Sequence, residues 1–409
     1  MTHDLQWLLG DTSLDEFFDR NFEKDLLHVN GRSRNYYEAV FAPADLDKIV
    51  AQSPEFVRQH MKHFRETHVG ANENTTARSD PPDGSAASLR AAHERGYTLV
   101  LRDMFRAWLP VAHLTREIQS VFFARLEVHL FVTPAGAQGL PAHYDSDDSF
   151  VLQISGSKHW RIFHNEVALP MGPQGKLVDA ARLGAPCRQL TMQAGDLLYV
   201  PRGLVHVAST SEAPSMHLTF GVFPYRWHEV LCDLICSLAE RDVSLRRSVP
   251  RTLLRAGALG AAAKRSEAGA QIASLLRSCV ANAALTEPIE THIRQFIDDL
   301  PMLEPGLFQS TPERTNHAQI YVKRAGMICC VYEADGKVVL KFPGGAISGP
   351  AAIRSAFEFV AEARGPFRTA DLPGELSQNS RSVLIRRLLH EGLLELQSTP
   401  SCPGNQTNN

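Results

Sequence analysis

The chain has 409 residues, of which 44% are hydrophobic and 21% charged, as in ordinary globular proteins. Its formal net charge of −3 gives no basis for strong non-specific attraction to nucleic acid or an anionic membrane, and no apolar run is long enough to span a bilayer. The seven cysteines follow no zinc-ligand spacing, and the first residues lack the features of a secretory signal. We therefore expect a cytoplasmic protein with reduced thiols and two or three domains.

The N-terminal part has mainly helical patterns. Capping residues and apolar spacing predict helices over Leu14–Asn21 and Pro43–Val50, and a short strand is predicted at Leu27–Val29. The stretch Glu66–Ser85 is polar and rich in turn formers, which predicts a surface loop. The alternative is a lid over a site.

Between Tyr97 and Pro224 the pattern changes to many short strands separated by glycine and proline, which predicts a β-sandwich or small barrel. A jelly roll of the cupin class is favoured, because its narrow interior receives side chains from several strands at one point. Tight turns are expected at Ser155–Gly156–Ser157 and Ala194–Gly195. The predicted strands are Arg125–Thr133, Ser149–Ser155, His159–His164, Arg188–Met192, Asp196–Val200, Val205–Ser209 and Met216–Val222.

After Trp227 the pattern becomes helical. His228–Glu240 carries an apolar stripe, with its two cysteines expected to serve as small packing residues, and Leu253–Val280 and Pro288–Leu300 continue as helices. The stripe is larger than one small bundle needs, so we expect a symmetric homodimer. A proline-bearing linker is expected at Asp299–Gly306.

The C-terminal part predicts a winged-helix module, because short strands accompany two helices. Lysine and arginine barely outnumber acidic residues in this part of the chain. Three arginines lie on the final helix, and we interpret them as the solvent-exposed face of that helix. We therefore expect no direct nucleic-acid binding. The tail from Gln397 is predicted to be disordered. The predicted strands are Gln319–Val322, Ile328–Tyr332 and Val338–Phe342, and the predicted helices are Gly349–Ala363 and Ser377–Glu391. The expected domains are 1–226 (barrel with N-terminal helices), 227–305 (helical region), 306–397 (winged helix) and 398–409 (tail).

The most informative motif is PAHYDSDDSFVLQISGSK, from Pro141 to Lys158, together with PRGLVHV further along the chain. His143 and Asp145 are two positions apart on a predicted strand, so both side chains face the same side. His206 follows a turn and begins another strand that could run beside the first. Two imidazoles and one carboxylate leave half of a metal's coordination sphere open, which is typical of non-haem Fe(II) centres.

Lys158 follows the motif closely and lies among apolar residues. Burying a lysine there is costly without an anion, so we predict that Lys158 binds a co-substrate carboxylate; an exposed turn lysine is the alternative. His217 and Thr219 share a face of the last barrel strand and either line the site or pack in the core. His159 and His164 flank a strand and are expected either at the surface or behind the metal ligands, and Asp147 and Asp148 are expected to be solvated loop acids.

These residues resemble the JmjC-type ribosomal oxygenases, which are cupin-like 2-oxoglutarate- and Fe(II)-dependent protein hydroxylases. The resemblance runs from TPAGAQGLPAHYD through DSFVLQISGSKHWRIF to GDLLYVPRGLVHVA, and the order of the flanking segments also matches. It implies an α+β chain with a double-stranded β-helix (JmjC) barrel, a helical dimerisation region and a C-terminal winged helix.

The resemblance also implies a set of roles. His143, Asp145 and His206 would bind Fe(II) as the catalytic centre, 2-oxoglutarate would be the co-substrate, and Lys158 would hold its distal carboxylate. Several family members carry asparagine and tyrosine where His129 and Phe131 stand here, and a serine near Gly221. His129 and Thr219 are therefore the expected further co-substrate contacts. The implied substrate is a protein side chain, with a ribosomal protein and a modified arginine or histidine favoured.

Three alternatives remain open on the sequence. A metal-binding cupin without oxygenase activity would use the same three ligands, but Lys158 would then have no carboxylate to bind. An oxygenase that acts on a biosynthetic peptide would share the whole site. A binding protein that acts through its C-terminal module would need a clear basic face, which the charge pattern does not provide.

Overall fold

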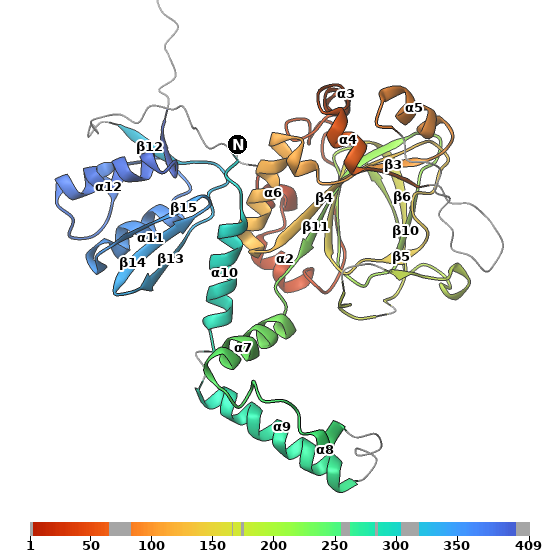
Figure 1. Ribbon diagram of the computed structural model, residues 1–409. Helices are drawn as coiled ribbons and strands as arrows, with labels where there is room; N and C mark the ends of the chain where they lie inside the picture. The colour runs from red at the N-terminus through yellow and green to blue at the C-terminus, as the bar shows by residue number, and fades with distance from the viewer. Residues whose placement is uncertain are drawn as a thin grey trace, which may run out of the picture. The chain divides into compact units, whose positions relative to one another are not determined.

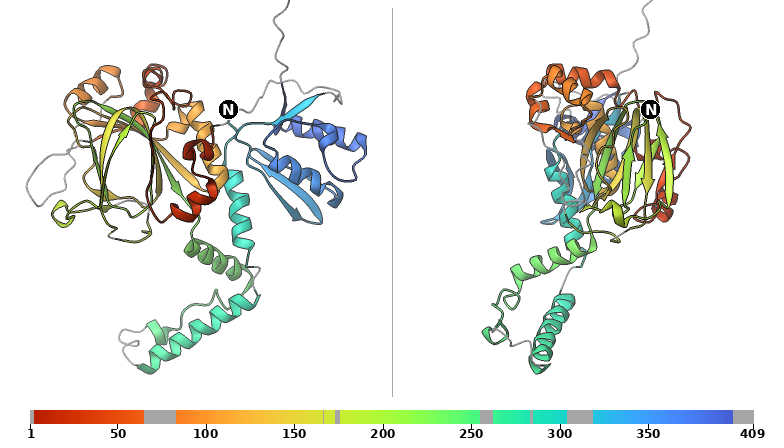
Figure 2. Two further views of the ribbon diagram at one scale, coloured as in Figure 1. Left: turned by 180° about the vertical axis from the view of Figure 1, so that it is seen from behind. Right: turned by 90° about the vertical axis from the view of Figure 1, so that its right-hand side faces the viewer.

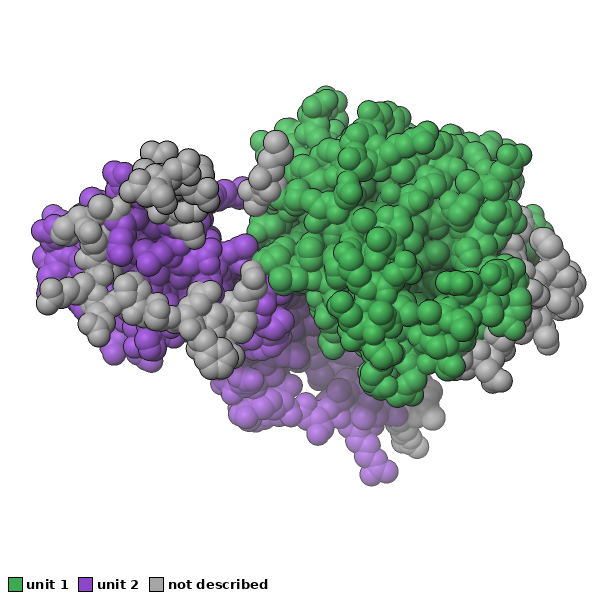
Figure 3. Space-filling model, turned by 90° about the horizontal axis from the view of Figure 1, so that it is seen from above, with its two compact units in different colours: residues 1–224 green, residues 225–409 purple. Residues whose placement is uncertain are grey.

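The computed structural model describes residues 3–64, 83–165, 167–172, 176–254, 262–282, 285–303 and 319–397. The chain divides into two compact units, Met1–Pro224 and Tyr225–Asn409, which are coloured separately in Figure 3. Most of the predicted loop Glu66–Ser85, the end of the predicted linker and the predicted tail lie outside the described residues. No helix in the described ranges is long and apolar enough to cross a membrane.

The first unit begins with helices that cover one side of a barrel (Figure 1). Both predicted helices and the strand β1 (Leu27–Val29) are confirmed, but the region predicted as all strands contains a long helix, α6. Val111, Leu114 and Ile118 of α6 are buried at helical spacing, which explains why this segment is not a strand. The helices are α1 (Leu5–Leu9), α2 (Leu14–Arg20), α3 (Pro43–Gln52), α4 (Pro54–His60), α5 (Ala86–Glu94) and α6 (Leu109–Phe122).

The barrel consists of two antiparallel layers joined by one long strand, β6 (Asp148–Ile162) (Figure 2). One layer has the order β2-β3-β4-β11-β6-β9-β1, and the other has the order β8-β6-β10-β5-β7. The remaining strands are β2 (Met61–Phe64), β3 (Thr98–Leu101), β4 (Arg125–Thr133), β5 (His143–Tyr144), β7 (Lys176–Leu177), β8 (Arg188–Gln193), β9 (Leu197–Val200), β10 (His206–Ser209) and β11 (Ser215–Phe223).

The predicted turn at Ser155–Gly156–Ser157 is wrong, because β6 continues through it. Gly156 has a φ of +68°, and an added Cβ would lie 1.8 Å from the carbonyl oxygen of Pro214. A glycine is therefore needed where the strand passes close to its neighbour. The pairing with β11 also shifts register beside this point, between Met216 and His217, as at a β-bulge. The strand bends and passes from one layer to the other without breaking.

Alternation along the strands separates the hydrophobic core from a polar interior. On β4, Leu126, Val128 and Leu130 are buried in the core formed with the N-terminal helices, whereas Glu127 and His129 line a cavity inside the barrel. The same alternation holds on β11, which pairs with β4 over its whole length. The main core therefore lies between one sheet layer and the helices, and the barrel interior is left for a site.

A buried ion pair joins the start of β6 to the turn before β10. Asp148 was predicted to be a solvated loop acid, but it is fully buried, and its Oδ2 accepts from Nη1 of Arg202 at 2.7 Å. Arg202 also pairs with Glu23 at 2.6 Å, and the hydroxyl of Tyr199 donates to Asp148 at 2.7 Å. Because the arginine and the tyrosine satisfy this carboxylate, it can be buried.

The second unit starts with α7 (Trp227–Arg241), followed by α8 (Arg251–Leu254), α9 (Ala262–Asn282) and α10 (Glu287–Asp299). The predicted apolar stripe of α7 is only partly covered. Val230, Leu234 and Leu238 are buried, whereas Leu231 and Ile235 are exposed, and Trp227 is 77% exposed. Contrary to prediction, the two cysteines of α7 are also exposed, so they do not serve as packing residues within one chain.

The C-terminal part has two small antiparallel sheets and two main helices around one hydrophobic core. The predicted strands and helices are present within a few residues, and three further strands were not predicted. The winged-helix assignment stays a prediction. The elements are β12 (Ile320–Lys323), β13 (Cys330–Ala334), β14 (Lys337–Phe342), β15 (Gly345–Gly349), α11 (Arg354–Glu362), β16 (Phe367–Arg368), α12 (Gln378–His390) and β17 (Leu394–Leu396).

The buried ion pair gives a stability prediction. Asp148→Asn removes the charge that balances Arg202, and we expect the free energy of unfolding to fall by about 3 kcal/mol in urea denaturation. The control is Glu16→Gln, which breaks the exposed Arg20–Glu16 pair and should cost about 0.5 kcal/mol or less. Equal effects of the two substitutions would contradict a stabilising role for the buried pair.

Candidate metal centre and its cavity

Strand pairing brings the three predicted metal ligands together. β5 and β10 are antiparallel neighbours, and His143 and His206 are direct partners in their register. The two imidazole centroids lie 4.4 Å apart. Asp145 follows β5, and its two carboxylate oxygens lie 3.7 Å from Nε2 of His143 and 3.6 Å from Nε2 of His206. One ligand atom from each residue falls within 4.8 Å of the others, which is close enough for a single ion.

Backbone carbonyls orient both histidine rings. Nδ1 of His143 lies 2.8 Å from the carbonyl oxygen of Pro141, and Nδ1 of His206 lies 3.0 Å from that of Leu204. A carbonyl only accepts, so each Nδ1 carries the proton and each Nε2 keeps its lone pair. Both lone pairs therefore lie on the side of Asp145, as a metal site requires.

Electrostatics keeps His206 in its metal-binding form. Burial, together with the charge of nearby His143, lowers the pKa of His206 from 6.5 to about 4. The ring is therefore neutral at physiological pH, and no proton has to leave it before it binds a cation. Asp145 is 31% exposed at the side chain, so solvent reaches the third ligand atom.

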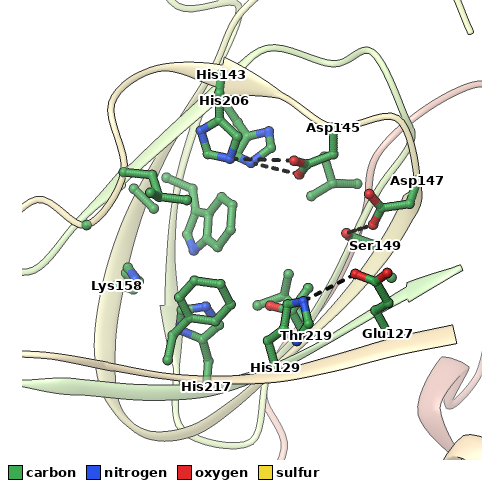
Figure 4. Close-up of a pocket in the computed structure, with 18 of the residues that line it drawn as sticks. Glu127, His129, His143, Asp145, Asp147, Ser149, Lys158, His206, His217 and Thr219 are labelled. Carbon is green, nitrogen blue, oxygen red and sulfur yellow. Dashed lines mark hydrogen bonds and ion pairs between the residues drawn. The ribbon is translucent and has the colours of Figure 1, made fainter. Parts of the chain in front are cut away.

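The three residues line a cavity of about 300 Å³ inside the barrel. Figure 4 shows Lys158 on one side of this cavity and the carboxylates of Asp147 and Glu127 on the other. Lys158 is only 3% exposed, whereas the side chain of Glu127 is 32% exposed. The cavity therefore has a buried cationic side and a more open acidic side, with the histidine pair between them.

All six predicted site residues line this one cavity: His143, Asp145, His206, Lys158, His129 and Thr219. His129 and Thr219 are cross-strand partners on β4 and β11. The burial of Lys158 excludes the exposed turn lysine that the sequence left open. His217 also lines the cavity, while His159 and His164 are exposed, as predicted.

Several further lining residues were missed, among them one acid that forms a hydrogen bond at the cavity wall. Asp147 was predicted to be a solvated loop acid, but its carboxylate accepts a hydrogen bond from Ser149 at 3.1 Å, and burial together with the charge of Asp145 raises its pKa to about 8. Glu127 and Trp160 also line the cavity. For Glu127 the available signal was alternation, because it lies two positions before His129 on β4 and residues two apart share a strand face. Asp147 lies in the turn between β5 and β6, where alternation gives no signal.

The closeness of Asp147 to β11 depends on a glycine. An added Cβ at Gly221 would lie 2.3 Å from Oδ2 of Asp147, so any larger residue would displace this carboxylate. Several members of the family that the sequence resembles carry a serine near this position. Here the carboxylate of Asp147 occupies the space that a larger side chain at Gly221 would need.

Comparison with known proteins places the barrel in a family. A family model described as a JmjC domain matches residues 102–230. Ribosomal oxygenase 1 of Gallus gallus is 28% identical over 326 residues, which cover 75% of this chain and 52% of that protein. The bifunctional lysine-specific demethylase and histidyl-hydroxylase NO66 of Aedes aegypti is 27% identical over 330 residues, covering 75% of this chain and 49% of that protein. The chain thus spans about half the length of these curated relatives.

A solved structure supports the fold. YcfD, a ribosomal oxygenase from Escherichia coli in complex with cobalt and 2-oxoglutarate, aligns over 95% of this chain and 99% of its own with a TM-score of 0.51. The sequences are 15% identical, so this similarity shows the fold alone. The predicted cupin-like JmjC barrel is confirmed. The chain thus contains a region that matches a JmjC domain, and it is similar over three quarters of its length to ribosomal oxygenase 1 and to NO66.

Proposed function

We propose that the protein is a 2-oxoglutarate-dependent dioxygenase that uses Fe(II) to hydroxylate a side chain of a protein substrate. The observation that carries this proposal is the combination, in one cavity, of a three-ligand metal face and a buried lysine that has no acidic partner among the described residues. A metal-binding cupin without oxygenase activity would also use the three metal ligands, but such a protein would not explain the buried lysine.

The donor set fits Fe(II). His143 and His206 each offer an unprotonated Nε2, and Asp145 offers a carboxylate oxygen, which together form the two-histidine, one-carboxylate set of non-haem iron oxygenases. All three donors come from two neighbouring strand segments. One face of a bound ion would therefore remain free for other ligands.

The buried side of the cavity fits a dicarboxylate. Nζ of Lys158 has a hydroxyl partner, Oγ1 of Thr133 at 3.1 Å, but no acidic side chain in the described ranges pairs with it. A buried ammonium group needs an anion, and a carboxylate of 2-oxoglutarate would supply it. His129 and Thr219 face the same cavity and would contact the co-substrate closer to the metal ligands.

When bound, Fe(II), 2-oxoglutarate and dioxygen supply the oxidising power that inserts oxygen into a C–H bond, with succinate and carbon dioxide as co-products. The side chains of the protein bind and orient these partners. Phe131 and Trp160 add apolar walls that limit the access of water to the buried side.

The substrate proposal rests on the relatives. Ribosomal oxygenases and a histidyl-hydroxylase are among the matches, so a ribosomal protein is the favoured partner, with arginine or histidine as the modified residue. A biosynthetic peptide is the alternative substrate. We also propose a cytoplasmic location, in line with the five cysteines whose side chains the structure describes, which are all free.

The proposed chemistry predicts the loss of activity in two ligand variants. His143→Ala and Asp145→Ala each remove one of three metal donors, so Fe(II)-dependent conversion of 2-oxoglutarate to succinate should fall by about 100-fold or more. His159→Ala, at an exposed histidine of the same barrel, is the control and should retain activity. Full turnover in both ligand variants would refute the metal assignment.

The lysine predicts a pH dependence of co-substrate binding. Burial lowers the pKa of Lys158 from 10.5 to about 7, whereas a bound carboxylate favours the charged ammonium form. Below pH 7 the ammonium is already present, and above pH 7 binding must take up a proton. The Kd for 2-oxoglutarate should therefore rise by about 10-fold per pH unit above 7.

Calorimetry on the Mn(II)-loaded protein, in buffers of different ionisation enthalpy, measures both this affinity and the proton uptake. Lys158→Met is the matched control, because it keeps the aliphatic chain and removes the titrating group. The variant should bind 2-oxoglutarate weakly and without the proton uptake. A flat affinity profile in the wild-type protein would show that Lys158 does not bind the carboxylate.

We further propose that residues 227–305 form a dimerisation region and that 306–397 form a winged-helix domain without direct nucleic-acid binding. The exposed apolar residues of α7 support the first assignment, because Trp227, Leu231 and Ile235 form a surface that is costly to leave in water. A second copy of the chain would cover it symmetrically.

The dimer proposal predicts a mass of twice 45.3 kDa in sedimentation equilibrium at micromolar concentration. Leu231→Glu combined with Ile235→Glu places charges on the exposed face of α7 and should shift the population toward monomer. Val383→Glu, at an exposed residue of α12, is the control and should leave the mass unchanged. A wild-type protein that is monomeric under these conditions would contradict the dimer.

A further inference from the structure

The buried side of the cavity holds more hydrogen-bond donors than acceptors. Nε1 of Trp160 and Nδ1 of His217 have no hydrogen-bond partner among the described residues, although the two side chains are only 5% and 3% exposed. Lys158 adds a third nitrogen, whose only hydrogen-bond partner within the described part of the chain is the Thr133 hydroxyl. Buried polar groups in native proteins are nearly always paired, so these nitrogens mark the place of a missing acceptor.

The position of His217 directs it toward the same space as Lys158. On β11, His217 and Thr219 face the cavity, whereas Leu218 between them lies in the hydrophobic core. The imidazole stacks on the ring of Phe131 with a centroid distance of 4.7 Å and an interplanar angle of 3°. Nζ of Lys158 lies 6.0 Å from the centre of that same ring.

The electrostatics of His217 agrees with its closeness to Lys158. Burial, together with the positive charge of Lys158, holds the pKa of His217 well below its usual value, so the imidazole is neutral. A neutral imidazole donates one hydrogen bond, and it adds no second positive charge beside the ammonium. In Figure 4 both residues lie away from the carboxylates of Asp147 and Glu127.

We propose that His217 is a second hydrogen-bond donor, beside Lys158, to the carboxylate of 2-oxoglutarate that lies farther from the metal ligands. This assignment rests on the function proposed above and names a residue that the sequence left undecided between site and core. Stacking on Phe131 fixes the plane of the ring, so the donor is pre-oriented before the co-substrate enters. Trp160 contributes a further N–H to the wall of the same space.

The competing interpretation is that His217 only packs in the core. Its partner on the neighbouring strand is Gln153, whose Oε1 also lacks a hydrogen-bond partner among the described residues. In that case removal of the imidazole nitrogens would change the stability of the protein. The substitution would not change how strongly the protein prefers 2-oxoglutarate over an analogue that lacks the distal carboxylate.

The test compares two ligands on Mn(II)-loaded protein by calorimetry. 2-Oxopentanoate has the same chain length as 2-oxoglutarate but carries a methyl group in place of the distal carboxylate. His217→Phe keeps the aromatic stack and removes both ring nitrogens. We expect the Kd for 2-oxoglutarate to rise by about 10-fold or more, the typical effect of losing a hydrogen bond to a charged group, and the Kd for 2-oxopentanoate to stay the same.

Two further variants control the measurement. His217→Asn restores an N–H donor and should recover part of the lost affinity for 2-oxoglutarate. His159→Phe removes an exposed imidazole from β6 and should leave both Kd values unchanged. Thermal unfolding of each variant reports stability, and His217→Leu replaces His217→Phe if the latter does not fold.

The outcomes separate this inference from the function on which it rests. If His217→Phe changes the Kd for both ligands equally, or changes neither, His217 is a packing residue and the inference is overturned, while the proposed function stands. If the wild-type protein binds Mn(II) but not 2-oxoglutarate, both the assignment of His217 and the proposed function are refuted. A change confined to 2-oxoglutarate supports the assignment.

Discussion

The antiparallel pairing of β5 with β10 is the constraint on which the site depends. It places His143 directly opposite His206, and the carbonyl groups of the same two segments hold both Nδ1 protons. The segments are also joined outside the pair: the N–H of Gly203 donates to the carbonyl of Asp145 at 2.9 Å, and Asp148 binds Arg202. The position of each metal ligand is thus set by backbone hydrogen bonds and one buried ion pair, before any metal binds.

Much of the site could be predicted because its chemistry is unusual. Two histidines and an aspartate at this spacing, followed by a lysine among apolar residues, indicate metal and anion binding more strongly than they indicate packing. Asp147, Trp160 and His217 are ordinary by residue type, and their roles depend on which strands become neighbours. His217 faces Phe131 only because β11 pairs with β4 in one particular register. Such long-range pairing is not encoded in local alternation.

The fold was predictable where local patterns were strong. The helices at the N-terminus, α7, α10 and most barrel strands follow their apolar spacing. Helix α6 was missed because it lies inside a segment dominated by strand formers. The long strand β6 was split in two because Gly156 is a turn former by local rules, whereas here it makes the close approach to Pro214 possible within a paired strand. Tertiary pairing overrode the local preference.

The bulge on β6 has a consequence for the whole cavity. Ile154 has no partner on β11, since Met216 pairs with Ser155 and His217 pairs with Gln153. Ser149 and Val151, which line the cavity before this point, are odd-numbered, whereas Lys158 and Trp160 beyond it are even-numbered. Lys158 follows Ser149 by an odd number of residues (158 − 149 = 9), so strict alternation would turn the lysine to the opposite face of its layer, and the extra residue of the bulge compensates for this. The bulge, and not the two motifs alone, thus keeps an ammonium group inside the barrel, and a homologue one residue shorter here would need no bulge to keep it there.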